Sequence, residues 1–446
     1  MRAARLLAVF AVVAALLGAV GPVGIARAQT EPEPTTPIRH FVFLMQGGRT
    51  FDNYFGTFPG ADGLPPGACQ PRSTDDPSQG CVRPFALHGT TPTPLSPTRS
   101  IIAAQLDRGR MNGFVSAYTA QGRDGSTAMG HYDDRDLPFS WAAARHGVLF
   151  DRFFSAVPYG IAAERSYWVS GAPVRGGDTV PPGGYGNRPT IFDRLQQAGI
   201  SWKFYVEGYR PHETFRTPGS TQPIRAPLLG YARFVDDPAL RGRIADLGQY
   251  YRDLDNGTLP SVAYIATNGS AERSARSLPA GQKLIRSLAT QLAVSRYWDS
   301  SALLWSYDSS GGWYDHVRPP RAADGPRGLR VPAVLISPYA RQGHIDHTVL
   351  DSTAALRFIE DNWRLKPLAR RDATSASIVG AFDFGSGPRA PEVLPVQPPR
   401  RPVGQVDSAA VYGVYGTAAG AALLLVTVAA VRSTRSRRAV REGTNR

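Results

Sequence analysis

Residues 41–48 read Phe-Val-Phe-Leu-Met-Gln-Gly-Gly, a short apolar run that ends in two glycines. A second apolar run, Ser301–Tyr307, is followed by Asp308 and soon after by another Gly-Gly pair, and a third spans Val331–Ser337. Runs this short and this uniformly apolar are typical of parallel strands that are buried on both faces. They therefore predict a covered parallel sheet.

Helical patterns lie between and after these runs. Apolar residues recur at helical spacing in Ile191–Ala198, Gln282–Ala293 and Ser352–Trp363. Strands that alternate with helices favour an α/β fold, with a mainly parallel sheet flanked by helices. Because ligands bind beyond the carboxyl ends of strands in such sheets, we expect the loops at Gly47 and Asp308 to meet at the functional site.

Composition excludes several classes of protein. The chain has 446 residues, of which 42% are hydrophobic, and two cysteines. It can bury a core, so it is neither disordered nor fibrous, and it has too few cysteines for a disulfide scaffold or a multi-cysteine zinc site. Cys69 and Cys81 lie in a stretch rich in Pro and Gly, which indicates a local disulfide; two buried free thiols are the alternative.

The positive charge is concentrated at the ends of the chain. Of the formal net charge of +14, eight charges come from the first 28 and the last fifteen residues together. The middle of the chain is only mildly basic, and we therefore predict no nucleic-acid partner.

Both ends carry apolar segments. Residues 1–28 show the basic, apolar and small-residue order of a secretory signal peptide; a retained anchor is the alternative. Residues 409–431 are uncharged and long enough, as a helix, to cross a bilayer. The Arg-rich tail 432–446 predicts a cytoplasmic C-terminus, because Arg marks the cytoplasmic side. We expect a single-pass protein of the cell membrane whose main body is extracytoplasmic.

The remaining boundaries follow from composition. Residues 29–37 form a short linker, residues 38–385 a single ectodomain without internal repeats, and residues 386–408 a Pro-rich linker. A Pro-rich linker of this kind acts as a semi-rigid spacer between a folded body and its anchor.

Residues 42–57, VFLMQGGRTFDNYFGT, resemble the opening motif of the bacterial phosphoesterase family, which includes phospholipases C and a related acid phosphatase. Further family strings follow in family order, among them residues 109–114, 136–139, 190–208, 307–317 and 330–338. The resemblance covers nearly all of residues 38–385. It implies an alkaline-phosphatase-like core that hydrolyses phosphate esters at a site assisted by a divalent metal ion.

The family positions that carry this chemistry are replaced here. The family's Glu-Asn metal ligands fall on Gly47 and Gly48, and its acidic pair falls on Asp308 and Ser309. The nucleophile position falls on Ile161, whose alkyl side chain cannot attack phosphorus. Residues of one site lose function as a unit, so the replacements predict impaired catalysis and leave open whether the metal is still bound.

Some polar residues near these positions remain. Arg273 stands where the family has a histidine, and a guanidinium can hold a phosphate with two parallel hydrogen bonds without a metal. The other candidates for a residual site are Thr50, Asp52, Asp308, Asp315 and His316. Asp308 is the candidate ligand for a residual metal ion. The alternative is that Asp52, Asp315 and His316 only hold loop backbone in place.

Three functional hypotheses follow. The first is an exported, membrane-anchored phosphoesterase-family protein that is catalytically impaired. The second is an active phosphoric-ester hydrolase with a rearranged site, which uses Thr50 as nucleophile or water activated by an ion on Asp308, Asp315 and His316. The third is a surface binder of anionic lipid or polymer. The expected ligand is a phosphate-containing small molecule or a lipid headgroup.

Overall fold

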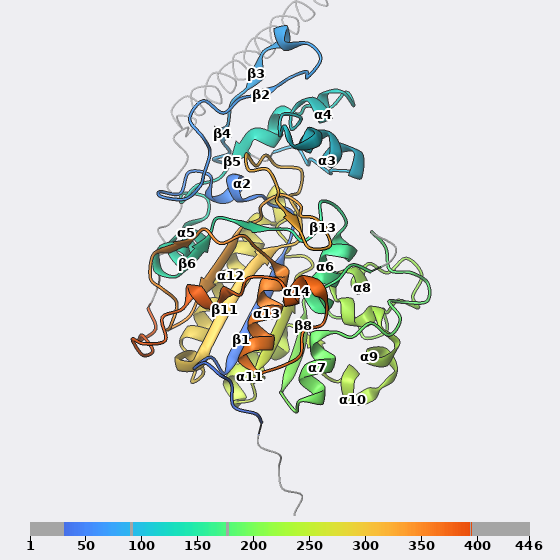
Figure 1. Cartoon of the computed structure of the whole chain (residues 1–446), viewed down its shortest axis with the longest axis vertical. Helices are drawn as coiled ribbons and strands as arrows, with labels where there is room; N and C mark the ends of the chain where they lie inside the picture. Colours follow the sequence, from blue (N-terminus) through green and yellow to red (C-terminus); the bar gives the residue numbers. More distant parts are fainter. Residues whose placement is uncertain (1–30, 90–91, 175–177, 393, 395–446) are drawn as a thin grey trace, which may run out of the picture.

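An eight-stranded sheet forms the centre of the protein in the computed structural model, which describes residues 31–89, 92–174, 178–392 and 394 (Figure 1). The strand order is β15-β6-β14-β11-β1-β10-β8-β9. The strands are β1 His40–Gln46, β6 Val148–Phe150, β8 Trp202–Val206, β9 Ile244–Asp246, β10 Val262–Ala266, β11 Ser301–Tyr307, β14 Ala333–Ile336 and β15 His344–Asp346. The predicted α/β fold with a mainly parallel sheet is confirmed.

Strand β1 lies in the middle of the sheet because it is apolar on both faces. Its residues from Phe41 to Gln46 are all buried, as is every residue of β11. β1 pairs in parallel with β10 on one side and β11 on the other, and Gln46 is in register with Tyr307. The carboxyl ends of β1 and β11 therefore lie side by side, as the sequence predicted.

Strand β14 differs from the prediction of a parallel strand at Val331–Ser337. It runs antiparallel to both β11 and β6. A parallel pair needs a crossover, usually a helix, to return the chain to the same end of the sheet. The chain between Tyr307 and Ala333 instead forms loops and the small β12–β13 ladder, Arg321–Ala322 with Gly325–Pro326, so β14 enters from the opposite end.

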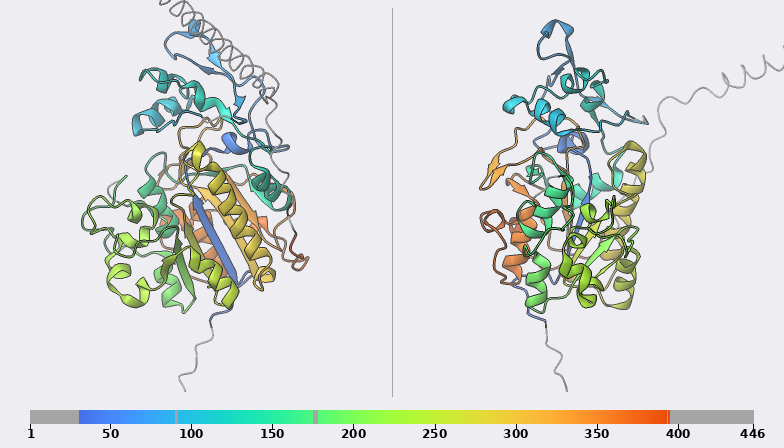
Figure 2. Two further views of the ribbon diagram at one scale, coloured as in Figure 1. Left: turned by 180° about the vertical axis from the view of Figure 1, so that it is seen from behind. Right: turned by 90° about the vertical axis from the view of Figure 1, so that its right-hand side faces the viewer.

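Helices cover both faces of the sheet (Figures 1 and 2). One face carries α11 Gly248–Asn256 and α12 Leu278–Ala293, and α5 Pro138–His146 packs against α12. The other face carries α6 Ile161–Ser170, α7 Ile191–Gln197 and α13 Ser352–Asn362. The shorter helices are α2 Phe51–Phe55, α8 Gln222–Arg225, α9 Ala232–Asp236, α10 Pro238–Arg241 and α14 Arg370–Ala373.

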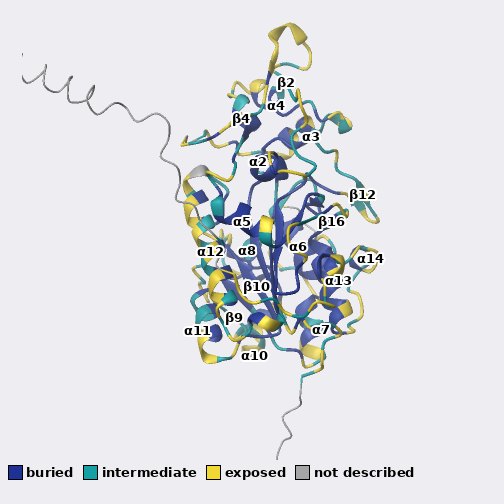
Figure 3. Ribbon diagram, turned by 90° about the vertical axis from the view of Figure 1, so that its left-hand side faces the viewer, coloured by how far each residue is buried: buried dark blue, intermediate teal, exposed yellow. Residues whose placement is uncertain are grey.

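A smaller subdomain lies beyond the carboxyl ends of the central strands (Figure 1). It contains α3 Arg99–Leu106, α4 Ser116–Thr119 and the short strands β2 Gln70–Pro71, β3 Cys81–Val82, β4 Phe85–Ala86 and β5 Gly130–His131. Cys69 and Cys81 form a disulfide with a Cα–Cα distance of 5.6 Å. Figure 3 shows that the outer tip of this subdomain is exposed, whereas the sheet beneath it is buried. The remaining two-stranded ladder joins β7 Phe153–Phe154 and β16 Leu350–Asp351.

Several sequence predictions fall outside the described residues. They are the signal peptide at 1–28, the apolar segment 409–431, the basic tail 432–446 and most of the linker 386–408. Within the part of the chain that the structure describes, no helix is both long enough and apolar enough to cross a bilayer.

Candidate functional site

The loops after β1 and β11 interlock at the carboxyl edge of the sheet. The Asp308 amide donates to the Gln46 carbonyl (3.0 Å) and the Arg49 amide donates to the Ser309 carbonyl (2.9 Å). Gly48 and Gly311 both have positive φ, and a Cβ on Gly311 would lie 2.1 Å from the Gly48 carbonyl oxygen. Only glycine at position 311 permits this approach.

Asp308 lies at the centre of this edge and is fully buried between two guanidinium groups. Arg165 donates to Asp308 Oδ2 from Nε (3.0 Å) and Nη2 (2.9 Å), and Arg273 Nη2 donates to the same oxygen. Burial alone would raise the pKa of Asp308, but Arg273 and Arg165 outweigh it and hold the pKa below its ordinary value. Asp308 is therefore an ionised carboxylate that is already neutralised by the protein.

The Arg273 side chain fills the space that larger side chains at Gly47 and Gly48 would need. A Cβ on Gly47 would lie 2.6 Å from Arg273 Cζ, and one on Gly48 would lie 3.2 Å from Arg273 Cα. Carbon atoms at the first of these distances overlap, so a ligating side chain at Gly47 and the guanidinium cannot share this volume.

The residues around Asp308 do not fit a divalent metal ion. Gly47 and Gly48 have no side-chain oxygen, and the Ser309 hydroxyl donates to Asp308 Oδ1 (3.1 Å). Hard divalent cations need several oxygen ligands, whereas one carboxylate remains here and two cations already occupy it. At this position a fixed positive side chain stands where a metal would be needed.

Glu272 anchors the backbone that carries Arg273. Its buried carboxylate accepts hydrogen bonds from the hydroxyls of Tyr54 (2.5 Å) and Tyr307 (2.7 Å) and from the Gln282 amide (2.9 Å). A Cβ on Gly281 of α12 would lie 2.1 Å from Glu272 Cγ, so the close packing of Glu272 on α12 requires glycine there. Because these contacts fix Glu272, the next residue starts from a defined position.

A cavity of about 360 Å³, here called the Arg273 cavity, opens beside this pair. Its polar lining includes Arg273, whose side chain is 33% exposed, together with Ser309, Ser310 and the one carboxylate Asp178, which lies 3.8 Å from Arg99. Ile161, the first residue of α6, lies on the wall at the position that the resemblance gives to the nucleophile. Its remaining apolar lining includes Pro94, Leu95, Pro97, Ile102, Pro158 and Ile224.

The charge beneath the Arg273 cavity is positive. Arg165 donates to the Arg225 backbone carbonyl (2.9 Å), and burial together with the positive charge of Arg273 lowers the pKa of Arg225. Arg165 and Arg273 contact the single carboxylate of Asp308, and the charge of Arg225 lies close enough to interact with it. The nearby Glu164 does not cancel this surplus, because burial raises its pKa to about 8 and leaves it mostly protonated at pH 7.

Thr50 is fixed by two hydrogen bonds and is buried. Its hydroxyl donates to the Tyr314 carbonyl (2.6 Å) and accepts from the Asn53 amide (3.2 Å), which makes Thr50 the N-cap of α2. The structure thus places Thr50 as a cap rather than on the lining of the Arg273 cavity.

Asp52, Asp315, His316 and Arg330 form a second group, here called the Arg330 cluster. Arg330 donates to Asp315 Oδ1 from Nε (2.9 Å) and to Asp52 Oδ1 from Nη2 (3.0 Å), and Asp52 Oδ2 contacts His316 Nδ1 (2.7 Å). Burial and the charge of Asp52 raise the pKa of Asp315 to about 6 despite Arg330. The two aspartates and Arg330 are inaccessible to solvent, with at most 1% of each side chain exposed.

Two clusters among the described residues bring enough donor atoms together to hold a metal ion. One is Asp52, Asp315 and His316, and the other is His88, Asp133 and Asp136; in each the donor atoms lie within 4.8 Å of one another. An arginine already contacts each cluster, Arg330 in the first and Arg135 in the second. The sequence placed Asp315 and His316 near Asp308, but the structure groups them with Asp52 and Arg330.

The buried arginines are what sequence reasoning missed. Arg49, Arg165 and Arg330 are all fully buried, and none was singled out as functional. In a chain with 50 Lys and Arg residues, a single Arg carries no signal of burial. The one available signal was the apolar character of the α6 sequence around Arg165, since a charged residue within a buried helix must find a partner.

Comparison with known proteins adds a family assignment. Residues 38–366 match the model of the Phosphoesterase family. The chain is 26% identical to the non-hemolytic phospholipase C of Burkholderia pseudomallei over 82% of its own length and 62% of that protein, just under two thirds. It is 27% identical to phospholipase C A of Mycobacterium tuberculosis, with 80% of each chain covered.

Solved structures show weaker likenesses. The phosphonate monoester hydrolase of Agrobacterium radiobacter matches with a TM-score of 0.40 and 11% identity, over 77% of each chain. A protein of the alkaline phosphatase superfamily from Vibrio parahaemolyticus matches with a TM-score of 0.38 and 11% identity, over 78% of this chain and 71% of that one.

Proposed function

The chain belongs to the Phosphoesterase family, and from that premise we propose that it binds a phosphate ester in the Arg273 cavity without hydrolysing it by the family's metal-assisted route. Hydrolysis of phosphate esters is the activity of the family as a whole. The observation that carries the proposal is the guanidinium of Arg273, which fills the space beside Gly47 and pairs with Asp308.

The electrostatics of the cavity support an anionic ligand. Arg165 and Arg273 share the single negative charge of Asp308, so one positive charge of this group remains uncompensated beside the cavity. A phosphate monoester is largely dianionic at pH 7, because its second pKa is about 6. A planar guanidinium binds such a group with paired hydrogen bonds. The apolar wall around Ile161 then suits the organic part of the ester.

The chemistry supports binding rather than turnover. Metal-assisted phosphoryl transfer needs a cation on the phosphoryl oxygens, a nucleophile in line with the leaving group and a proton donor. Arg273 can supply the positive charge. The nucleophile position is Ile161, and the Thr50 hydroxyl already donates to a backbone carbonyl.

Two measurements on the purified full-length chain test this function. Calorimetry with phenyl phosphate should show binding that Arg273→Ala weakens by about tenfold or more, since hydrogen bonds to charged groups contribute about 1.5–3 kcal/mol. Arg276→Ala is the matched control, because Arg276 is exposed and lies three positions away. Unchanged affinity in Arg273→Ala would refute the binding proposal.

The second measurement is turnover. We expect no hydrolysis of p-nitrophenyl phosphate or of phosphatidylcholine with Mg²⁺, Ca²⁺, Mn²⁺ or Zn²⁺. The rival hypothesis, a hydrolase with a rearranged site, predicts turnover that disappears in Asp308→Ala or Asp315→Ala. Such turnover would overturn the proposal of impaired catalysis and leave the binding site to be tested separately.

We also propose that the protein is exported and anchored by residues 409–431, with its main body outside the cytoplasm. The support is the sequence pattern of residues 1–28, 409–431 and 432–446. The protein should stay in the membrane fraction after carbonate washing, and external protease should digest the main body on intact cells. Release by carbonate would contradict the anchor.

A further inference from the structure

Helix α12 presents cations without carboxylates. Its sequence, LPAGQKLIRSLATQLA, contains Lys283 and Arg286 but no Asp or Glu. Both side chains are exposed, and neither forms an ion pair or a side-chain hydrogen bond within the described part of the chain. Isolated surface cations of this kind remain free to attract an anionic partner.

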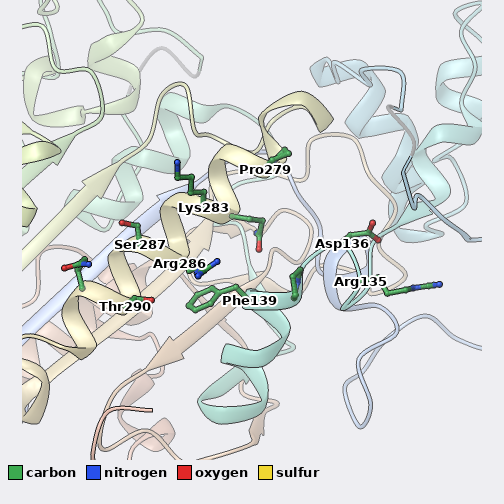
Figure 4. A pocket seen from close by; sticks show the side chains of 11 residues that line it. Arg135, Asp136, Phe139, Pro279, Lys283, Arg286, Ser287 and Thr290 are labelled. Atoms are coloured by element: carbon green, nitrogen blue, oxygen red, sulfur yellow. The ribbon is translucent and has the colours of Figure 1, made fainter. Parts of the chain in front are cut away.

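A groove runs along this helix. One part, with a volume of about 600 Å³, lies between α12 and the start of α5, where Figure 4 shows Arg286 and Phe139 facing each other. A second part, of about 230 Å³, shares Phe139, Arg286 and Thr290 with the first and extends past Val294. We call the two parts together the α12 groove.

Two carboxylates border the α12 groove, one at each end, and each contacts a histidine. Asp136 contacts His88 (2.8 Å) at one end, and Glu392 contacts His146 (3.0 Å) at the other. Neither forms an ion pair with Lys283 or Arg286 in the described part of the chain. The far end also exposes an apolar side chain, because Val294 is 66% exposed. The groove thus combines unpaired cations with apolar surface.

We propose that the α12 groove lies against the surface of an anionic bilayer. Amphipathic surfaces with Lys and Arg beside exposed apolar residues bind at the lipid headgroup level, and each cation near an anionic surface adds about fivefold to the affinity. This interaction surface is separate from the Arg273 cavity and does not depend on binding there.

The position of the groove in the chain favours lipid over another occupant. Leu394, the last described residue, lines the groove, and the apolar segment 409–431 begins fifteen positions later. That length of chain spans at most about 50 Å, so an anchor at 409–431 leaves the groove within reach of the bilayer, and the attraction of the cations has to bring it into contact. The intervening segment is a poor occupant itself, because it carries Arg400 and Arg401 with Asp407 as its one acid.

A fluorescence experiment tests the proposal. Both native cysteines are in the disulfide, so Gln291→Cys gives a single labelling site on exposed α12. The labelled full-length chain is placed in nanodiscs of phosphatidylcholine, with or without phosphatidylglycerol, that carry a headgroup quencher. We expect clear quenching in anionic discs and weak quenching in neutral ones.

Charge reversal provides the decisive variant. Lys283→Glu with Arg286→Glu should reduce quenching in anionic discs to the level in neutral discs. The matched control is Lys366→Glu with Arg370→Glu, which reverses two exposed cations in and beside α14. These residues lie near α13 on the opposite face of the sheet, so the control should leave the quenching unchanged. If the double variant folds poorly, Val294→Asp tests the proposal independently. It changes one exposed apolar residue of the groove and should likewise reduce quenching in anionic discs.

The outcomes separate the alternatives. Equal quenching in neutral and anionic discs, or no loss on charge reversal, would overturn the proposal. A label that stays unquenched in discs but responds to polyglutamate would also overturn it and would indicate an acidic protein partner. Co-elution of the chain with the discs is scored separately, so failure of the proposed anchor is distinguished from failure of the groove to dock.

Discussion

The Arg273 cavity and the Arg330 cluster both bury aspartate against arginine, yet they differ in accessibility. Arg330 is completely buried and satisfies two aspartates at once, whereas Arg273 is one-third exposed and shares a single aspartate with Arg165. Around Asp308 two arginines share one aspartate, whereas around Arg330 two aspartates share one arginine, with His316 as a further partner of Asp52. A surplus of positive charge next to a cavity therefore indicates a ligand site. A buried cluster such as the Arg330 cluster, whose charges are matched and inaccessible to solvent, indicates a structural role.

The largest expected effect is on stability and concerns the Arg330 cluster. Arg330→Met should lower the free energy of unfolding by about 3–5 kcal/mol, because it leaves Asp315 buried without a direct cationic partner and Asp52 with only its contact to His316. Urea denaturation followed by circular dichroism measures this. Arg152→Met removes a partly exposed pair with Asp62 and should cost less than about 1 kcal/mol. Equal, small losses would show that the Arg330 cluster is accessible to water.

The next effect is the pH dependence that Glu164 gives to the free energy of unfolding. Burial raises the pKa of Glu164 to about 8 in the folded protein, above its ordinary value of 4.5. Between these pH values the unfolded chain loses a proton that the folded chain keeps, so stability falls as the pH rises. Glu164→Gln should remove a slope of up to about 1.4 kcal/mol per pH unit. Denaturation midpoints from pH 5 to 8 measure it, and parallel curves for both proteins would contradict it.

A smaller effect tests whether Arg273 is held where it is needed. Gly47→Ala places a methyl group 2.6 Å from Arg273 Cζ, so the flexible end of that side chain must move. We expect a several-fold loss of phenyl phosphate affinity in calorimetry, with little change in stability. Gly380→Ala, where a methyl meets nothing within 4 Å, is the control. Full affinity in Gly47→Ala would show that the observed position of the guanidinium does not matter for binding.

The smallest effect separates a cap from a catalytic residue. Thr50→Ala removes the N-cap of α2 and should cost about 1 kcal/mol of stability, while Thr50→Ser should keep most of it. Neither change should alter phosphate affinity, because Thr50 does not line the Arg273 cavity. Thermal unfolding and calorimetry on the same samples check both statements. A loss of affinity with unchanged stability would assign Thr50 to the ligand site.

The sequence predicted much of the fold and part of the site. The apolar runs at 41–45 and 301–307 predicted two buried strands whose ends meet, and β1 and β11 confirm it. The direction of β14 was wrong, because strand direction depends on the path of the connecting chain and not on the apolar run itself. The sequence also could not predict that Asp315 and His316 group with Arg330, because nothing in the sequence around Arg330 indicates that this residue is buried.

By itself, the sequence determined which atoms are available at the functional edge. Glycine at 47 and 48 and isoleucine at 161 exclude side-chain ligation and nucleophilic attack in any fold, because those chemistries need oxygen, nitrogen or sulfur atoms. Only the tertiary structure decided that the Arg273 guanidinium occupies the space beside Gly47 and shares Asp308 with Arg165. These residues lie far apart in the chain, and the pairing of buried charges is settled by packing of the whole fold and not by local pattern.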